Sequence, residues 1–247
     1  MNSTPCAILL AGGRGTRISH LQPNAPKPMI PIGGRPFIEW VIRHFQSQGV
    51  RRFVVSLGHL AEVAEAHFRE RRADGSAIDT VRETEPLGTG GGFLFAAQAA
   101  GDADPLLLAN GDSLALADLT GVWKLLEDPA VDGVVVGLEV DDAARYGGLE
   151  VDQAGRLLRF REKQPGGRLI NAGVYCFRRR VLASFPRKTP LSMELDVFPA
   201  ILRQGARLMV HVCSAPFLDI GTPESLGEAE SFVAKHWPRQ NLATVLK

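Results

Sequence analysis

The chain of 247 residues has few cysteines, no long apolar run and almost no excess of charge. Its three cysteines, Cys6, Cys176 and Cys213, form neither a C-x-x-C motif nor an even set, so we expect buried thiols rather than a disulfide framework or zinc knuckle. No apolar run reaches the ~18–20 residues of a membrane span, and residues 1–6 lack the basic start of a signal peptide. We therefore expect no membrane partner and a cytoplasmic location.

The charge balance argues against a nucleic-acid partner. Lys and Arg total 28 against 27 Asp and Glu, which gives a net charge of +1. A chain built around a polyanion-binding surface carries a clear basic excess. The basic runs at 51–52, 71–72 and 178–180 have no interleaved aromatic residues on which bases could stack. We interpret these runs as solvated surface.

Apolar runs and helical patterns alternate along the first half of the chain. Short apolar runs predict strands at 6–11, 52–57, 78–82, 106–109 and 133–140. Helical spacing predicts helices at 36–48, 61–72, 89–100 and 116–126. Strands that are apolar on both faces and separated by helices favour a parallel sheet covered on both sides, which binds ligands where strands end.

In the second half of the chain, the first predicted strands follow one another without intervening helices. Closely spaced strands at 149–152, 157–162 and 171–177 suit antiparallel pairing. A helix at 193–203, a strand at 207–213 and a helix at 223–236 follow. The expected fold class is α/β, a Rossmann-like three-layer mixed sheet with a small antiparallel lobe.

Glycine is over-represented, with 26 residues, and several glycines follow the first predicted strand. The loop reads Leu10-Ala11-Gly12-Gly13-Arg14-Gly15-Thr16-Arg17, and Lys27-Pro28 comes shortly after it. Glycines let backbone N–H groups approach an anion, and the basic side chains add charge, a combination that suits a triphosphate. The dinucleotide pattern G-x-G-x-x-G fails at Ile18, and the Walker A pattern is absent.

Together with later segments, this loop resembles the signature of the sugar-phosphate nucleotidyltransferases. Further motifs of that family recur in order over nearly the whole chain. They are Pro86-Leu87-Gly88-Thr89-Gly90, Asn110-Gly111-Asp112, Glu162-Lys163, Asn171-Ala172-Gly173 and Asp219-Ile220-Gly221-Thr222-Pro223. One departure is Ile18-Ser19-His20, where many members have Leu-x-Pro.

The resemblance implies a reaction in which a sugar 1-phosphate attacks the α-phosphorus of a nucleoside triphosphate and pyrophosphate leaves. Two polyanions must meet, so basic side chains and Mg²⁺ are expected to neutralise them. The implied catalytic residues are Arg17, Lys27, Asp112 and Lys163. The implied Mg²⁺ ligands are Asp112 and Asp219. The implied nucleotide-binding residues are Leu10, Ala11, Gly12, Gly13, Arg14, Gly15, Thr16, Gly88, Thr89 and Gly111.

The same resemblance implies that the sugar phosphate is held by Gly147, Glu162, Lys163, Asn171 and Gly173. Each motif also has a purely structural explanation. The aspartates could serve as turn or cap residues, Gly88 as a helix entry, and Glu162-Lys163 as an exposed ion pair. The run Gly90 to Gly92 costs about 1 kcal/mol per residue in a helix interior, which favours a close approach to a ligand. Asn171 and Gly173 could belong to a β-bulge.

Family membership implies a single nucleotidyltransferase domain over 1–247, with the nucleotide-binding part at about 1–140 and the sugar-phosphate-binding part at about 141–236. A homodimer is the default expectation. From the length of 247 residues we expect no long C-terminal domain of the kind that bifunctional members carry. A silent nucleotide-sugar sensor is disfavoured because all the implied ligands are present. A glycosyltransferase is disfavoured because Asp102-Ala103-Asp104 precedes its strand, as a solvated turn would.

Among compact members, the segments 84–91 and 110–113 look most like those of the enzymes that transfer the guanylyl group of GTP to D-glycero-D-manno-heptose 1-phosphate. That reaction makes GDP-heptose for bacterial capsule, S-layer glycan or lipopolysaccharide. Mannose 1-phosphate with GTP, and glucose or N-acetylmuramate 1-phosphate with UTP, are the alternatives.

Overall fold

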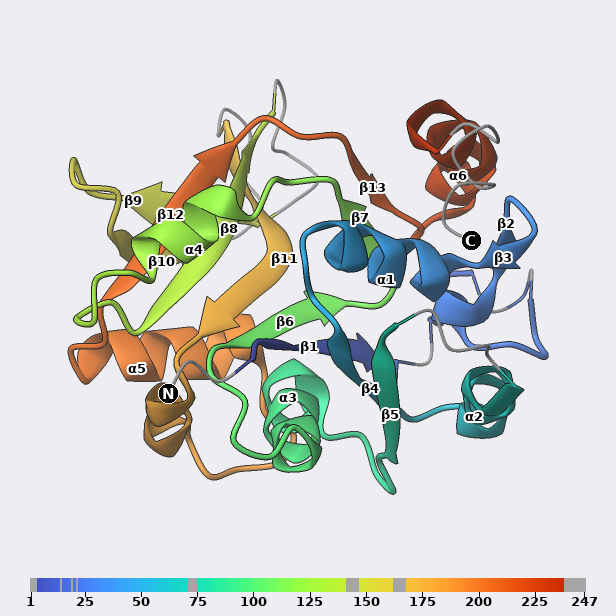
Figure 1. Cartoon of the computed structure of the whole chain (residues 1–247), viewed down its shortest axis with the longest axis horizontal. Coiled ribbons are helices and arrows are strands. Elements are labelled where there is room, and N and C mark those ends of the chain that lie inside the picture. Colours follow the sequence, from blue (N-terminus) through green and yellow to red (C-terminus); the bar gives the residue numbers. More distant parts are fainter. Residues whose placement is uncertain are drawn as a thin grey trace.

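The computed structural model describes residues 4–13, 15–18, 20, 22–70, 75–140, 147–161 and 168–237. Its centre is a nine-stranded mixed sheet with helices on both faces (Figure 1). The expected α/β class with a mixed sheet is confirmed. No helix within the described ranges is both long and apolar enough to span a membrane.

One side of the sheet is parallel and comes from the first half of the chain. Its strands are β1 (Cys6–Ala11), β4 (Arg52–Leu57), β5 (Ala77–Arg82) and β6 (Leu106–Asn110). They lie in the order β6-β1-β4-β5, and Leu10 is opposite both Ser56 and Asn110. Their carboxyl ends are thus level, so the residues that follow each strand gather at one edge of the sheet.

The second half of the chain extends this sheet instead of forming a separate one. Its strands are β8 (Gly133–Glu139), β9 (Gly148–Val151), β10 (Leu157–Arg161), β11 (Leu169–Phe177) and β12 (Leu208–Cys213). Strand β11 pairs antiparallel with β6, β8 and β9, whereas β12 pairs parallel with β8. The predicted antiparallel pairing is confirmed, and β11 lies directly beside the strand that leads to Asp112.

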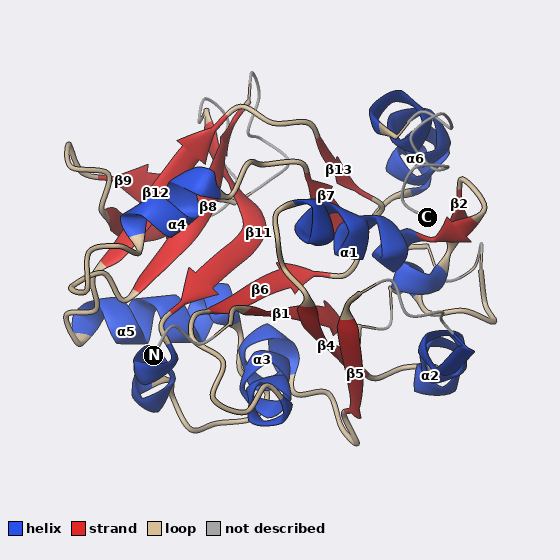
Figure 2. Cartoon of the chain, viewed as in Figure 1, coloured by secondary structure: helices blue, strands red, loops and turns tan. Residues whose placement is uncertain are grey.

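Helices cover both faces of the sheet (Figure 2). They are α1 (Phe37–Ser47), α2 (Ala61–Glu70), α3 (Gly88–Ala99), α4 (Thr120–Leu125), α5 (Phe198–Arg203) and α6 (Pro223–His236). Alternate residues of β1 point to opposite faces. Ala7 and Leu9 join the core beneath α1 and α4, while Cys6 and Ile8 join the core above α3 and α5. This alternation explains why β1 reads as a continuous apolar run.

The helix expected at 116–126 begins only at Thr120. The preceding residues form β7 (Ser113–Ala115), which pairs antiparallel with β13 (Phe217–Asp219). The amide of Leu116 donates to Pro216 and prolongs this pairing. The prediction at 116–119 was wrong because the Leu116 amide pairs with Pro216 and the Asp118 carboxylate accepts from the Thr120 amide at 2.8 Å, at the observed start of the helix.

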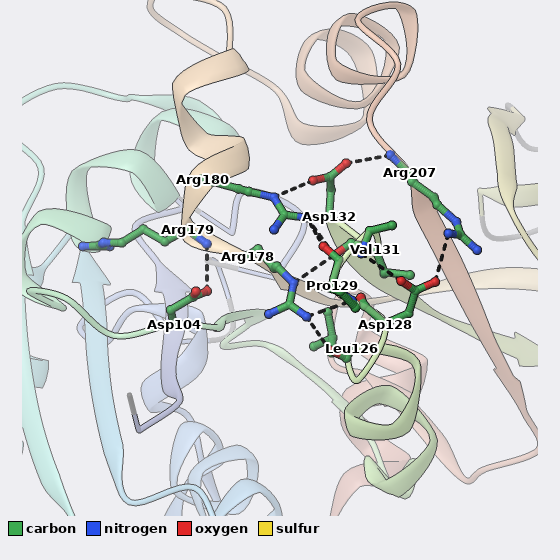
Figure 3. Close-up of polar contacts among 11 residues, drawn as sticks. Asp104, Leu126, Asp128, Pro129, Val131, Asp132, Arg178, Arg179, Arg180 and Arg207 are labelled. Atoms are coloured by element: carbon green, nitrogen blue, oxygen red, sulfur yellow. Dashed lines mark hydrogen bonds and ion pairs between the residues drawn. The ribbon is translucent and has the colours of Figure 1, made fainter. Parts of the chain in front are cut away.

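The basic run at 178–180 is not merely solvated surface (Figure 3). Arg178 Nε donates to the Val131 carbonyl at 3.0 Å, and another nitrogen of the same guanidinium donates to the Leu126 carbonyl. Arg180 Nε lies 2.9 Å from Asp132 Oδ1, whose second oxygen accepts from the Arg207 amide. These contacts tie the end of β11 to the loops before β8 and β12, so the run has a structural role.

Asp104 is likewise not simply solvated. Its Oδ1 accepts the Arg179 amide at 2.9 Å, which fixes the start of the turn after β11 (Figure 3). Its position before β6 leaves it outside the carboxyl edge of the sheet. The structural interpretation of this D-x-D motif therefore holds, with a specific partner.

The cysteines behave as small apolar residues. Cys6 and Cys176 are buried, Cys213 is half-buried, and all three are reduced. Burial raises the pKa of the Cys6 thiol to about 11. A thiol with so high a pKa is protonated and unreactive at neutral pH, as the sequence led us to expect.

Candidate active site

The glycine loop leaves β1 at the carboxyl edge of the sheet. It packs so closely against the end of β4 that a Cβ on Gly58 would lie 2.5 Å from the Gly12 carbonyl oxygen. Gly15 has a φ of +57°, and a Cβ there would lie 3.1 Å from Lys27 Cβ. Around Gly13, by contrast, a Cβ would find no neighbour among the described atoms within 4 Å. The loop therefore has a packed side and a side open to a ligand.

The basic residues of this loop differ in their surroundings. Arg17 is exposed, as is Thr16, whereas Lys27 is only 9% exposed. Arg14 lies outside the described residues. Leu10 and Ala11, the other predicted residues of the loop, are the last two residues of β1.

Lys27 is the centre of an ion-pair cluster that also contains Asp112 and Asp219. Its ammonium lies 2.7 Å from Asp112 Oδ2 and 3.2 Å from Asp219 Oδ1. The side chains of the two aspartates are about one-third exposed, at 31% and 33%. Three residues that the sequence analysis singled out separately thus meet at one point, with the carboxylates open to a ligand on one side.

The short β7–β13 ribbon explains why the two aspartates meet. Asp219 is opposite Ser113 in that ribbon, and the Ile220 amide donates to the Asp112 carbonyl at 3.2 Å. On the other side, the Gly111 amide donates to the Leu10 carbonyl, and a Cβ on Gly111 would lie 2.9 Å from that oxygen. Gly111 is therefore required for packing against the end of β1, and it directs Asp112 toward the loop.

The Asp112 and Asp219 pair fits Mg²⁺ bound together with a phosphate ligand. In the part of the chain that the structure describes, no group of three or more His, Cys, Asp or Glu side chains could hold a metal. Mg²⁺ commonly uses one or two carboxylates, substrate phosphates and retained waters. The two carboxylates already share one cation, the Lys27 ammonium. They are thus arranged for a positive charge between them.

The start of α3 is held by the segment 191–193. Gly88 has a φ of +76°, and a Cβ on it would lie 2.5 Å from the Leu191 carbonyl oxygen. That oxygen accepts the Gly90 amide at 2.8 Å, and Thr89 Oγ1 accepts the Met193 amide at 2.8 Å. The glycines at 88 and 90 are thus explained by close packing inside the protein, whether or not a ligand also approaches them.

Glu83 is a candidate that the sequence analysis missed. It follows β5 at the same edge, and its carboxylate accepts from Ser56 Oγ at 2.8 Å and from the Leu87 amide at 3.3 Å. A Cβ on Gly12 or Gly92 would lie within 3.0 Å of Glu83 Oε1, at 2.9 Å and 2.7 Å. The carboxylate thus lies between the glycine loop and α3. Its signal in the sequence was an acidic residue directly after a parallel strand.

Three of the predicted sugar-phosphate residues, Gly147, Asn171 and Gly173, form a second cluster beside the aspartates. The backbone N–H of Asn171 donates to the Gly147 carbonyl at 2.9 Å, and the side-chain oxygen Oδ1 of Asn171 accepts from the backbone N–H of Gly173 at 3.0 Å. Gly173 has a φ of +69°, and a Cβ on it would lie 2.9 Å from Asn110 Nδ2. Asn110 is two residues before Asp112, so this cluster adjoins the ion pairs.

The sequence offered structural explanations for two of the sugar-phosphate motifs, a β-bulge at Asn171 and Gly173 and an exposed ion pair at Glu162-Lys163. The pairing of β11 with β8 changes register between Asn171 and Tyr175, so the irregularity expected of a β-bulge is present. Bulges often re-aim side chains next to active sites, so this irregularity is compatible with a binding role for Asn171. Glu162 and Lys163 lie outside the described residues.

Comparisons with known proteins agree with this architecture. D-glycero-alpha-D-manno-heptose 1-phosphate guanylyltransferase from Aneurinibacillus thermoaerophilus is 29% identical over 227 residues, which are 91% of this chain and 96% of that protein. Mannose-1-phosphate guanylyltransferase from Mycobacterium tuberculosis is 35% identical over 223 residues, which are 88% of this chain but only 61% of that protein.

A solved structure is also similar throughout. HddC from Yersinia pseudotuberculosis, in a crystal structure with GMP-PN, superposes with a TM-score of 0.80 at 32% identity, covering 92% of this chain and 98% of that one. Residues 6–236 match the model of the family described as nucleotidyl transferase. That match covers every strand of the central sheet and every residue of both clusters. The resemblance indicated by the motifs is therefore confirmed, and the chain belongs to the nucleotidyl transferase family.

Proposed function

We propose that this chain transfers the guanylyl group of GTP to a sugar 1-phosphate and releases pyrophosphate. An oxygen of the sugar phosphate attacks the α-phosphorus of GTP and forms a new P–O bond. The bond between that phosphorus and the oxygen bridging to the β-phosphate breaks, and the electron pair leaves with pyrophosphate. The observation that carries the proposal is the Lys27 ammonium held between Asp112 and Asp219 beside the glycine loop.

The residues of this site suit the binding of two anions. The open side of the loop at Gly13 and the exposed Arg17 would bind the triphosphate, with Lys27 adding a cation. Asp112 and Asp219 would hold Mg²⁺, which supplies charge neutralisation at the phosphates. We propose that Lys163 neutralises the phosphate of the incoming sugar. Charge neutralisation and alignment are the main demands of phosphoryl transfer.

The sugar would be held by the cluster of Gly147, Asn171 and Gly173, which lies beside Asn110. We propose D-glycero-D-manno-heptose 1-phosphate as the preferred sugar, so that the product is GDP-heptose for a bacterial surface glycan. The support is that the heptose relative matches this chain over nearly its full length. Mannose 1-phosphate is the second candidate, because the mannose relative has the higher identity, 35% against 29%.

A pyrophosphate-release assay with the four common nucleoside triphosphates, each paired with heptose, mannose, glucose and N-acetylmuramate 1-phosphate, tests this function. We expect the highest kcat/KM for GTP with heptose 1-phosphate. A preference for GTP with mannose 1-phosphate would support the second candidate. Equal use of all four nucleotides, or no pyrophosphate with any pair, would contradict the proposal. The cytoplasmic location and the homodimer stay predictions.

Glu83 supports GTP as the nucleotide. A carboxylate only accepts hydrogen bonds, and the base edge of guanine offers two adjacent donors, N1–H and the N2 amine. Uracil offers one N–H flanked by two carbonyl oxygens, which a carboxylate would repel. Because Glu83 lies between the glycine loop and α3, we propose that it accepts from the guanine edge.

Glu83→Gln is expected to lower the ratio of kcat/KM for GTP over UTP about tenfold, since one charge-assisted hydrogen bond to the base is weakened. Glu85→Gln removes the same charge from a nearby exposed residue and serves as the matched control, with an unchanged ratio. Both ratios come from the pyrophosphate assay. If the two variants discriminate GTP from UTP as well as the wild type does, Glu83 does not read the base.

A further inference from the structure

Tyr175 carries a buried phenol that the proposed mechanism does not use. Its side chain lies in the core between the sheet and α5, only 2% exposed, and its ring packs edge-on against Phe198 with centroids 5.1 Å apart. Burial and the neighbouring Glu194 carboxylate raise the pKa of Tyr175 well above its ordinary value. The hydroxyl therefore stays protonated at neutral pH.

For each hydrogen bond around this hydroxyl, only one assignment of donor and acceptor is possible. The Gly173 amide is a donor, so the Asn171 atom that it meets at 3.0 Å is the oxygen. The Asn171 Nδ2 group must then face Tyr175, to whose hydroxyl it donates at 2.6 Å. Since the phenol oxygen accepts this bond, its own hydrogen goes to Glu194 Oε1 at 3.0 Å. The three residues form a chain from Asn171 through Tyr175 to Glu194.

This chain fixes the side-chain amide of Asn171. A flip of the amide would place its oxygen toward the Tyr175 hydroxyl and its NH₂ group toward the Gly173 N–H, where two donors would meet. The fixed amide retains a second N–H and a second lone pair, each in a set direction. A donor and an acceptor in set directions suit a hydroxyl group of a sugar, which both donates and accepts.

The Glu194 end of this hydrogen-bond chain lies beside the start of α3. Glu194 also accepts from Ser192 Oγ at 3.3 Å. The adjacent Met193 amide donates to Thr89 Oγ1 at the start of α3. The segment 191–194 therefore contacts both α3 and the chain that fixes Asn171. Because this segment is held against α3, the Glu194 carboxylate is fixed in place as the acceptor for the Tyr175 hydroxyl.

From this geometry we infer that Tyr175 and Glu194 are positioning residues for the sugar, because they hold the Asn171 side-chain amide in a single orientation. The inference rests on the proposed function, in which Asn171 binds the sugar. It adds two buried or half-buried residues that never touch the substrate but determine how well it binds.

Steady-state kinetics with the sugar 1-phosphate that the wild type uses best tests this inference. Tyr175→Phe keeps the ring but removes the hydroxyl, so we expect the KM for the sugar 1-phosphate to rise about tenfold. The KM for GTP and the kcat should stay within about twofold. Asn171→Ala should raise the same KM, and adding Tyr175→Phe to it should cause no further rise, because Tyr175 acts only through Asn171.

Two controls separate positioning from stability. Glu194→Gln keeps an acceptor oxygen for the phenol and should leave the KM near that of the wild type, whereas Glu194→Ala should raise it as Tyr175→Phe does. Phe198→Leu removes ring packing on Tyr175 and should lower the thermal midpoint without changing the KM for the sugar.

The outcomes are distinguishable. No pyrophosphate release by the wild type would overturn the proposed function, and this inference with it. Normal turnover by the wild type with an unchanged KM for the sugar in Tyr175→Phe would overturn the inference alone. A KM effect of Tyr175→Phe that persists in full in the Asn171→Ala background would also overturn it, since Tyr175 would then act by another route.

Discussion

Asp112→Asn is expected to lower kcat about a thousandfold while leaving the fold intact, because it removes one of the two carboxylates proposed to hold the Mg²⁺ that neutralises the phosphates. The Asp112 carboxylate lies 2.7 Å from the Lys27 ammonium. The second carboxylate of the proposed metal site, Asp219, is on β13, opposite Ser113 of β7. The ribbon itself uses the backbone carbonyl of Asp112, which the substitution keeps. Turnover is measured by pyrophosphate release, and folding by circular dichroism and thermal unfolding.

Asp102→Asn is a suitable control for this experiment, since Asp102 is an exposed aspartate at the opposite end of β6. Its turnover should match that of the wild type. If Asp112→Asn also turned over at a near-normal rate, Asp112 would not belong to the metal site, and the proposed role of the carboxylate pair would be wrong.

Lys27→Met is expected to weaken the binding of GTP about a hundredfold, since it removes the buried cation that we propose pairs with the triphosphate. Binding of the sugar 1-phosphate should change by no more than about twofold. Met keeps the aliphatic stem, against which Gly15 packs, so the loop should retain its conformation. Both affinities are measured by isothermal titration calorimetry. Equal losses for the two ligands would contradict the assignment of Lys27 to the triphosphate.

The same variant has a second expected effect of opposite sign. Without the ammonium, Asp112 and Asp219 lose the cation that they share at 2.7 Å and 3.2 Å. We therefore expect Lys27→Met to bind Mn²⁺ more tightly than the wild type in the absence of nucleotide, as measured by electron paramagnetic resonance. Mn²⁺ affinity that stays the same or falls would show that the carboxylates do not hold a metal.

Much of the fold could be predicted from the sequence because its strands are apolar on both faces. The predicted strands at 6–11 and 52–57 have the observed bounds of β1 and β4. Amphipathic spacing located α1 to within one residue at each end. Asp112 and Asp219 were found because each follows a short apolar run and belongs to a family motif, and the structure brings them together on Lys27.

What the sequence did not reveal depends on contacts between distant segments. Strands β7 and β13 have three residues each, too few for a periodic pattern, and they pair across about a hundred intervening residues. The reason for Gly88 lies in the backbone of Leu191, which no local pattern indicates. Glu83 was missed because a lone acidic residue after a strand is a weak signal until the loop and α3 are seen to enclose it.

A crystal structure of the complex with Mg²⁺ and a non-hydrolysable GTP analogue tests the central claim most directly. We expect the phosphates to lie against the Gly12 to Gly15 loop, the metal between Asp112 and Asp219, and the Lys27 ammonium transferred from these carboxylates to the triphosphate. Phosphates bound elsewhere, with Lys27 still paired to both aspartates, would contradict the account.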